Sequence, residues 1–442
     1  MPKARKIRAG VARVNITPAV GVELVGFAGR GPSIGVGDEL YATALVVDDG
    51  RETAAIFHLD LIGIDATWTQ MAAELIGKRG RLPAENVVLC STHTHYGPTV
   101  RAYDDDPNVS PEAAFMAELK FKLAGAVQEA RSRMGPVVAS VGRGTSDIGI
   151  NRREMLDDGT VILGRNPQGT IDREVIVVRL NRPSGEPLAC LLNFATHPVS
   201  QTGHGRLISA DFPGYARETI EAVTGTTCMF IQGASGNINS DIMEHSLDTP
   251  KTLGKRLGGA AISAYETAEP VALGPIGVAC KEAKLPAKNY DTLEDAQSAV
   301  AEHQAACDEA VAGKGNKGRI WWAEHQLNKA KACLESFESG KPLPPVVAPI
   351  WGVVMGDVGL ATGPGEIFCQ IGMAVKDAGA VAHTMYASCT NGSIGYVPMP
   401  EAYPDGGYEV DRASRVGPGA ATIVTDTAIA MLKRAKSRAR RK

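Results

Sequence analysis

The sequence contains no run of about 18 apolar residues, the length that a membrane-spanning helix requires, so we expect no membrane span. The basic residues 1–8 are not followed by the apolar core of a secretory signal, and we therefore expect a cytoplasmic protein. The eight cysteines form no CxxC pair and lie scattered in apolar segments, a distribution typical of reduced, buried thiols. Acidic and basic residues nearly balance, at a formal net charge of -3, which argues against nucleic-acid binding as the main function.

Short apolar and β-branched segments alternate with amphipathic segments along the chain. This pattern predicts an α/β fold with mixed β-sheets flanked by helices. The segments 41–50 and 52–64 are predicted to be two strands joined by an Asp-Gly turn, and 66–79 to be the helix that follows them. The long apolar run 350–360 predicts a single strand near the end of the chain.

The composition changes in the segment 286–345, where charged residues dominate and apolar residues recur at helical spacing. Thr292 and Asp295 have the spacing of a capping box, and a Gly-rich link at 313–318 separates two helical stretches. We therefore predict a helical hairpin, inserted into a single α/β domain that is formed by residues 1–285 and 346–442. The sequence does not decide whether this hairpin is a lid over the active site or a dimerisation arm, and it leaves open whether the chain forms a homo-oligomer.

Two histidines, His93 and His95, follow the apolar segment 86–90 at the point where a predicted strand gives way to a loop. In an extended backbone, residues i and i+2 face the same side and lie about 6.6 Å apart along the chain. The two imidazoles then share one face, where either both bind a metal or one binds it while the other transfers protons. Partly solvated histidines without a function are the alternative at this point.

Other predicted strands deliver further potential metal ligands to loops. His197 follows the apolar segment 191–194 in a second Thr-His pair. Glu366 follows a Pro-Gly turn, and we expect it in the first turn of a helix. Asp60 lies inside an apolar strand, where it either orients a histidine or caps the next turn. Ligands at strand ends are typical of sites in α/β folds, and three N or O ligands with an open position are the pattern of catalytic zinc.

The order of the motifs THTHYGP, NFATHP, GASGNIN, GPGE and NGSIGYVP, followed by GGYE, resembles that of the neutral/alkaline non-lysosomal ceramidase family. Members of this family are zinc amidases that cleave an N-acyl bond, and the resemblance extends from Val14 to about Glu409. It implies that one zinc ion per chain is held by His93, His197, Glu366 and Tyr396. It also implies a proton-transferring residue, an oxyanion-stabilising residue and a substrate-contacting residue, which are His95, Tyr408 and Arg152.

One loop departs from the family pattern, because Asn239 stands where the family's Gly-Asp-x-Ser-Pro motif has its serine. A serine nucleophile is therefore excluded, and a metal-activated water remains as the attacking group. We expect Asn151 and Asn239, together with Arg152, to contact the substrate. The sequence also lacks the secretion signal and the C-terminal immunoglobulin-like domain of true ceramidases, so we expect a small soluble amide as the substrate rather than ceramide.

The main hypothesis is therefore a divergent, zinc-dependent amidohydrolase with a small-molecule substrate. A zinc-dependent esterase or lactonase is the alternative among enzymes, because the same attacking group cleaves esters more easily. A non-catalytic ligand-binding homologue is the alternative outside enzymes. It is suggested by the replacement at Asn239, whereas the retention of His95 and Tyr408 argues against it.

Overall fold

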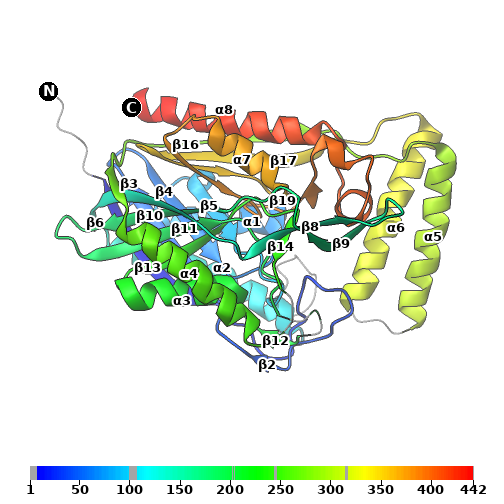
Figure 1. The fold of residues 1–442 in the computed structure, drawn as a ribbon, viewed down its shortest axis with the longest axis horizontal. Coiled ribbons are helices and arrows are strands. Elements are labelled where there is room, and N and C mark those ends of the chain that lie inside the picture. The colour runs from blue at the N-terminus through cyan, green and yellow to red at the C-terminus, as the bar shows by residue number, and fades with distance from the viewer. Residues whose placement is uncertain are drawn as a thin grey trace.

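The structure, a computed structural model, describes residues 7–98, 107–201, 203, 205–242, 246–313 and 317–441. Three larger sheets form the centre of the molecule, and helices cover their outer faces (Figure 1). The predicted class, an α/β fold of mixed sheets flanked by helices, is confirmed.

The first sheet carries the strand that leads to the histidine pair. Its strands, in the order β5-β4-β3-β1-β6, are β5 (Val87–Ser91), β4 (Thr53–Leu59), β3 (Tyr41–Asp48), β1 (Arg8–Asn15) and β6 (Gly135–Pro136). β3 and β4 form the predicted antiparallel pair, whereas β4 and β5 are parallel. Side-chain caps at Asp65 and Ser110 begin the two helices on its outer face, which are α1 (Ala66–Gly80) and α2 (Pro111–Ser132). The short helix η1 (Ala84–Asn86) leads into β5.

The second sheet carries the strand that leads to the third histidine. In the order β13-β11-β10-β7-β15, its strands are β13 (Thr227–Gln232), β11 (Pro187–Phe194), β10 (Glu174–Asn181), β7 (Val138–Thr145) and β15 (Glu269–Val271). β11 and β13 run parallel, and most of their side chains are buried because both faces of the sheet are covered. The helices on the outer face are α3 (Asp211–Thr224) and α4 (Thr249–Glu266).

The third sheet corrects one prediction, because the segment 350–360 is not a single strand. A tight turn at Gly356, whose φ is 66°, divides it between two antiparallel strands. Apolar residues on both sides of this turn are buried, so hydrophobicity alone marked no break. The sheet consists of β16 (Ile276–Leu285), β17 (Val346–Met355), β18 (Val358–Thr362) and β20 (His383–Ala387), and its helices are α7 (Cys369–Asp377) and α8 (Ala420–Arg441).

The inner faces of the three sheets pack on one another through a shared cluster of buried aliphatic side chains, among them Leu45, Ile56, Val178, Leu191, Val353 and Leu360. Burial of each such side chain contributes about 1.5–3 kcal/mol, so the ends of the central strands are held firmly. Beyond these ends lie smaller sheets, formed by β2 (Gly35–Val36) with β12 (Leu207–Ile208), by β8 (Gly149–Met155), β9 (Val161–Asn166) and β14 (Ile238–Ser240), and by β19 (Glu366–Ile367) with β21 (Tyr396–Val397).

Two long helices, α5 (Leu293–Ala312) and α6 (Lys317–Ser339), lie side by side at one end of the molecule (Figure 1). α5 begins with the predicted capping box of Thr292 and Asp295. α6 is attached to the body by the side chains of Gln326 and Lys329, which donate to the carbonyls of Arg412 (3.1 Å) and Ser414 (2.7 Å). Arg412 ends the short π-helical turn η3 (Tyr408–Arg412), which follows the 3-10 turn η2 (Pro400–Ala402).

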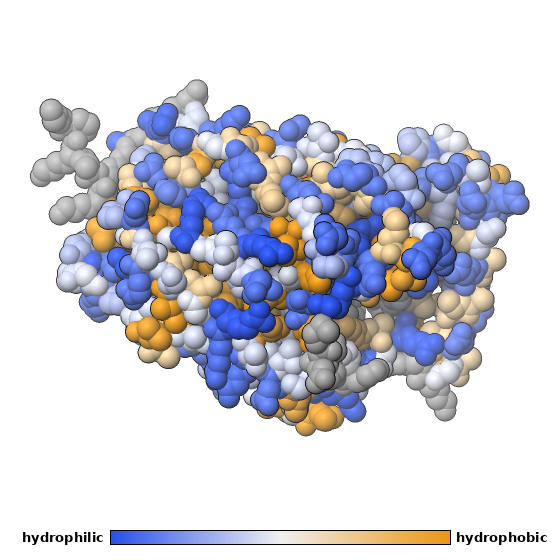
Figure 2. Space-filling view, in the orientation of Figure 1, coloured by the Kyte–Doolittle hydropathy of each residue, from blue (hydrophilic) through white to orange (hydrophobic). Residues whose placement is uncertain are grey.

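The face of the molecule in Figure 2 shows hydrophilic and hydrophobic residues interspersed in small groups. None of the helices in the described segments combines the length and the apolar character that a membrane span needs. All eight cysteines are free thiols, and Cys280 alone among them is exposed.

Candidate metal centre and active site

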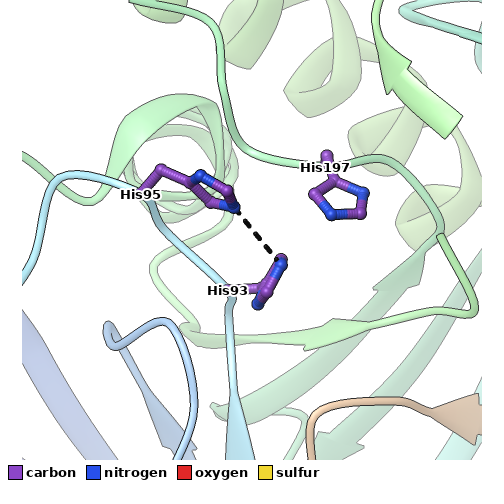
Figure 3. Close-up of side chains that lie close together, drawn as sticks. All are labelled: His93, His95 and His197. Atoms are coloured by element: carbon purple, nitrogen blue, oxygen red, sulfur yellow. Dashed lines mark hydrogen bonds between the residues drawn. The ribbon is translucent and has the colours of Figure 1, made fainter. Parts of the chain in front are cut away.

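Three histidines from two different sheets meet where their strands end (Figure 3). His93 and His95 follow β5, and His197 follows β11. The Nε2 atoms of His93 and His95 lie 3.3 Å apart, and the rings of His93 and His197 have their centroids 4.7 Å apart. One ligand atom from each of the three imidazoles lies within 4.8 Å of the other two, an arrangement that could hold a metal ion.

His93 does not have the extended backbone on which its predicted orientation depends. β5 ends at Ser91, and His93 has a φ of 69°, a left-handed conformation that costs a non-glycine residue about 1–3 kcal/mol. The N–H of His93 donates to the Leu61 carbonyl at 2.9 Å, which fixes this turn. The two imidazoles therefore meet because the chain turns after the strand, and not because of the pleat of a strand.

Backbone carbonyls fix the ring orientation of two of the histidines. The Nδ1 atom of His93 lies 2.6 Å from the Ile62 carbonyl, and the Nδ1 atom of His197 lies 2.7 Å from the Ser235 carbonyl. Because a carbonyl only accepts hydrogen bonds, Nδ1 must carry the proton in both rings. Their Nε2 atoms therefore present lone pairs in the neutral state, as metal-ligating imidazoles do.

Glu366 lies in the short strand β19 and not in the first turn of a helix, where the sequence predicts it. Its N–H donates to the Gly395 carbonyl at 3.0 Å, and the residue pairs in parallel with Tyr396. These contacts keep the backbone extended, so α7 begins only at Cys369. The Oε2 atom of Glu366 lies 3.0 Å from Nε2 of His197 and 3.3 Å from Nε2 of His93.

This donor set fits a divalent cation. Two nitrogen lone pairs that face one carboxylate oxygen at these distances repel it unless a positive charge lies among them. Although burial opposes it, Cys389 and Glu366 raise the pKa of His93 well above its ordinary value, so the pocket favours a positive charge at this position. Burial, and after it the charge of Arg152, lowers the pKa of His197 to about 4, so that ring is neutral and ready to bind a metal. Imidazole nitrogens with a carboxylate oxygen are a ligand set that suits zinc.

Tyr396 and Arg152 adjoin this centre. The Tyr396 hydroxyl lies 3.4 Å from Nε2 of His197, and the register of β19 and β21 places Tyr396 directly beside Glu366. The buried Arg152 donates to the Tyr396 hydroxyl at 2.8 Å and to Oδ1 of Asn239 at 3.1 Å. The Arg152 guanidinium also forms an ion pair with the carboxylate of Glu409, whose Oε1 lies 2.7 Å from Nε of Arg152.

His95 differs from the other two histidines in what surrounds its second nitrogen. Its Nδ1 atom is buried and has no hydrogen-bond partner in the segments that the structure describes, and it faces Gly26 so closely that a Cβ at Gly26 would lie 2.4 Å away. Phe27 packs edge-on against the ring, with centroids 5.2 Å apart. Burial, and after it the charges of His93 and His197, lowers the pKa of His95 well below its ordinary value. His95 is therefore a neutral imidazole whose tautomer no carbonyl fixes.

Two further predicted site residues, Tyr408 and Asn151, have different surroundings. Tyr408 begins η3, and its ring centroid is 5.7 Å from that of Tyr396. Burial raises the pKa of Tyr408 to about 12, so its hydroxyl keeps its proton. The side chain of Asn151 is engaged with its own turn, because it donates to the Thr170 carbonyl at 2.8 Å and accepts from the Arg153 N–H at 3.0 Å. The structure thus gathers most of the predicted residues and turns Asn151 toward a neighbouring loop.

Residues 7–247 match the family model described as neutral/alkaline non-lysosomal ceramidase, N-terminal, which covers more than half of the chain. The chain belongs to this ceramidase family. A relative in the family, the neutral ceramidase of Pseudomonas aeruginosa, is 22% identical over 461 residues, which cover 91% of this chain and 68% of the relative. The resemblance predicted from the motifs is therefore confirmed.

Solved ceramidase structures share the fold. The crystal structure of neutral ceramidase from Pseudomonas aeruginosa matches with a TM-score of 0.74 at 19% identity, over 99% of this chain and 75% of the other. A ceramidase complexed with C2 matches with a TM-score of 0.73 at 18% identity, over 98% of this chain and 76% of the other. At these identities the match concerns the arrangement of the elements.

Three residues beside the centre of this ceramidase-family chain were not predicted from the sequence to have a role. Glu409 is buried and pairs with both Arg152 and Arg153, at 2.7 and 2.9 Å. Gly26 makes room for the His95 ring, and Arg30 donates to the His95 carbonyl. Glu409 belongs to the motif GGYE, which could have drawn attention to it, whereas Arg30 lies in a Gly-rich segment without a recognisable motif.

Proposed function

We propose that this protein is a zinc-dependent hydrolase that cleaves an amide bond of a small soluble substrate. The observation that carries the proposal is the position of the Glu366 carboxylate, 3.0 and 3.3 Å from the Nε2 atoms of His197 and His93. Membership of the ceramidase family supports hydrolysis of an N-acyl bond. The identity of the metal is inferred from the ligand chemistry, since nitrogen and carboxylate donors suit zinc.

In this proposal His93, His197, Glu366 and Tyr396 hold one zinc ion per chain. When bound, the ion would lower the pKa of a water molecule and polarise the substrate carbonyl. The carbonyls of Ile62 and Ser235 orient the two imidazoles, an arrangement that supports metal affinity. Burial raises the pKa of Tyr396 well above its ordinary value, and Arg152, which donates to the Tyr396 hydroxyl, acts against this shift and favours the ionised form that a ligand needs.

His95 accepts the proton of the attacking water and returns it to the leaving nitrogen. A base for this task must be neutral at the start, and the lowered pKa of His95 meets that requirement. Tyr408 keeps its phenolic proton and donates a hydrogen bond to the oxyanion. Arg152, Asn239 and Asn151 position the substrate, although Asn151 would first have to release the Thr170 carbonyl.

The proposed substrate is a small soluble amide, not ceramide, and the proposed location is the cytoplasm. The replacement of the family's loop serine by Asn239 supports a substrate choice that differs from that of the ceramidases. The Oδ1 atom of Asn239 accepts from Arg152 and therefore belongs to the surroundings of the reaction centre. Esters and lactones remain the competing substrates, which a matched panel separates.

The test combines metal analysis with substrate hydrolysis. We expect about one zinc per wild-type chain and its loss, together with activity, in His197→Ala. His303→Ala is the matched control, because His303 lies on α5. Hydrolysis of amides and of esters with the same acyl groups identifies the bond that is cleaved. A wild type that contains no zinc and cannot be reconstituted with it would contradict the proposal and favour a ligand-binding homologue.

A further inference from the structure

Arg30 carries a buried positive charge that has no carboxylate partner within the described part of the chain. The residue is 9% exposed. Its Nη2 atom donates to the carbonyls of Val25, at 3.0 Å, and of His95. The Nε and Nη1 atoms are buried and have no hydrogen-bond partner among the described residues, so three N–H bonds of the guanidinium are unsatisfied there.

The surroundings of Arg30 stabilise its charge only in part. Its guanidinium carbon lies 5.2 Å from the ring centroid of Phe27 and 5.0 Å from that of Tyr96, distances at which cation–π attraction acts. Aromatic faces do not replace the hydrogen bonds that water would give to Nε and Nη1, and an unpaired buried charge is costly. Burial lowers the pKa of Arg30 to about 10, so it remains a cation near neutral pH.

Other buried or nearly buried arginines of the described chain show what is missing. Arg152 and Arg153 share the carboxylate of Glu409. Arg217 pairs with the buried carboxylate of Asp60 at 2.6 Å. The fold thus neutralises comparable guanidinium groups with carboxylates of its own, and Arg30 is left as a cation for which an anion from outside the chain is the natural partner.

Arg30 lies against the residue that transfers the proton in the proposed reaction. It bonds the His95 carbonyl directly, and Phe27, whose ring it overlies, contacts the His95 imidazole. An anion held by Arg30 would therefore lie beside the proposed proton-transferring residue. Such a group selects substrates by charge and not by apolar length.

We propose that Arg30 binds a carboxylate of the substrate, so that the substrate class is an amide with an acidic group close to the scissile bond, such as an N-acyl amino acid. This inference rests on the proposed hydrolase function of the histidine centre. It narrows the substrate class of that function to acidic amides, because a neutral lipid amide would leave the Arg30 guanidinium unpaired.

The first experiment compares N-acyl amino acids with the matching N-acyl amines, in which hydrogen replaces the carboxylate. We expect wild type to prefer the acids in kcat/KM, and Arg30→Gln to lose about 10- to 100-fold on the acids, the range for a hydrogen bond to a charged group. Because Arg30 also bonds the His95 carbonyl, the readout is the kcat/KM for the acid divided by that for the matching amine, and this ratio should fall by the same factor. Arg165→Gln, which removes an exposed arginine paired with Asp241, is the control. It should leave the ratio of kcat/KM for acids to kcat/KM for amines unchanged.

The second experiment measures binding without turnover, so that failure of the hydrolase proposal can be recognised separately. N-sulfonyl amino acids and the matching neutral sulfonamides resist hydrolysis, and calorimetry gives their affinities for the purified protein. Wild type should bind the acids more tightly, and Arg30→Gln should abolish that preference. Equal affinities for acids and neutral analogues in wild type would overturn the inference, whether or not any amide is hydrolysed.

A second variant, which keeps the positive charge, tests the inference if the first variant does not fold. If Arg30→Gln does not fold, Arg30→Lys is compared, because lysine retains a cation on a differently shaped side chain. The inference then requires weaker binding of the acids with unchanged binding of the neutral analogues. Unchanged affinity for both classes would contradict it.

Discussion

Three imidazoles with the same chemistry differ at this site in the partner of their second nitrogen. His93 and His197 each have Nδ1 against a backbone carbonyl, which fixes the tautomer that a metal ligand needs. His95 has its Nδ1 atom against the backbone of Gly26, without a polar partner. This difference supports two ligands and one proton-transferring residue.

The residue-scale prediction concerns His95→Gln. We expect the variant to retain its zinc while kcat falls by about 10²- to 10⁴-fold, the usual contribution of a general base. Zinc per chain and kcat are measured on the same preparation. Loss of zinc from a folded His95→Gln protein would mean that His95 is a ligand, and the division of roles would then be wrong.

Much of the candidate site could be predicted from its residues, but its geometry could not. Short motifs identified His93 and His197 because each follows an apolar strand. The left-handed turn at His93 depends on Leu61, and the strand at Glu366 depends on Tyr396; both partners are distant in the sequence. The unpaired charge of Arg30 becomes visible only when all its neighbours are known.

At the scale of elements, the helices α5 and α6 contact a segment that carries proposed catalytic residues. Gln326 on α6 is largely buried and donates to the Arg412 carbonyl at the end of η3. The same short turn begins with Tyr408 and includes Glu409. The helical pair therefore braces the segment that holds the predicted oxyanion donor, whether it also acts as a lid or in dimerisation.

This contact gives an element-scale prediction for Gln326→Ala. Loss of the hydrogen bond should lower stability by about 1 kcal/mol and loosen η3, which reduces kcat more than it changes KM. Urea unfolding and steady-state kinetics measure the two effects. Gln304→Ala on α5 is the control, because the Gln304 side chain bonds Asp308 and Lys331 within the helical pair. Equal kinetics for the two variants would argue against a contribution of Gln326 to η3.

A second element-scale contact joins β4 to α3 and predicts a pH dependence of stability. His58 lies 2.8 Å from Asp60 and 3.2 Å from Arg217, and burial, followed by the charge of Arg217, lowers the pKa of His58 to about 4. The unfolded chain binds this proton below about pH 6.5, whereas the folded protein binds it only below about 4. Unfolding therefore takes up a proton between these values, and the free energy of unfolding falls as the pH is lowered.

The measurement compares urea unfolding of wild type and His58→Gln between pH 7 and pH 4. As the pH is lowered, the free energy of unfolding of wild type should fall more steeply than that of the variant, by up to about 1.4 kcal/mol per pH unit. Asp38 and Asp211, whose pKa values burial raises, act in the opposite direction in both proteins, so the difference isolates His58. Parallel stability curves would show that His58 is not the group that titrates.

The elements themselves were largely predictable where local signals exist. Alternating apolar segments and the capping box at Thr292 gave the strands and the start of α5. The turn at Gly356 was missed because both flanking strands are buried and apolar. The pairing order of the strands depends on contacts between distant segments, which local periodicity does not contain.

At the scale of the whole molecule, the proposed metal centre joins separate sheets. His93 follows a strand of the first sheet, His197 follows a strand of the second, and Glu366 and Tyr396 form the small β19–β21 pair. A ligand that binds only the folded state stabilises it according to its concentration and affinity. The centre is therefore expected to act as a crosslink between layers as well as a reaction site.

Removal of the metal should accordingly destabilise the entire fold. With free zinc at about 100 times its dissociation constant, the holo protein should gain about 2.7 kcal/mol over the chelated protein, seen as a higher Tm. Thermal unfolding with and without a chelator measures this difference. His197→Ala should show no response to the chelator, and an unchanged Tm in wild type would contradict a structural contribution of the metal.

The chain leaves the third sheet for α5 and α6 and returns to it at adjacent positions. Leu285, the last residue of β16, is paired with Val346, the first residue of β17. Without the helices, these strands would form an ordinary β-hairpin, so the register of the sheet does not depend on the length of the segment that joins them. The helical pair could therefore be replaced by another connecting segment, in evolution or by engineering. The residues that contact η3 would then change, while the strand pairing of the third sheet would stay the same.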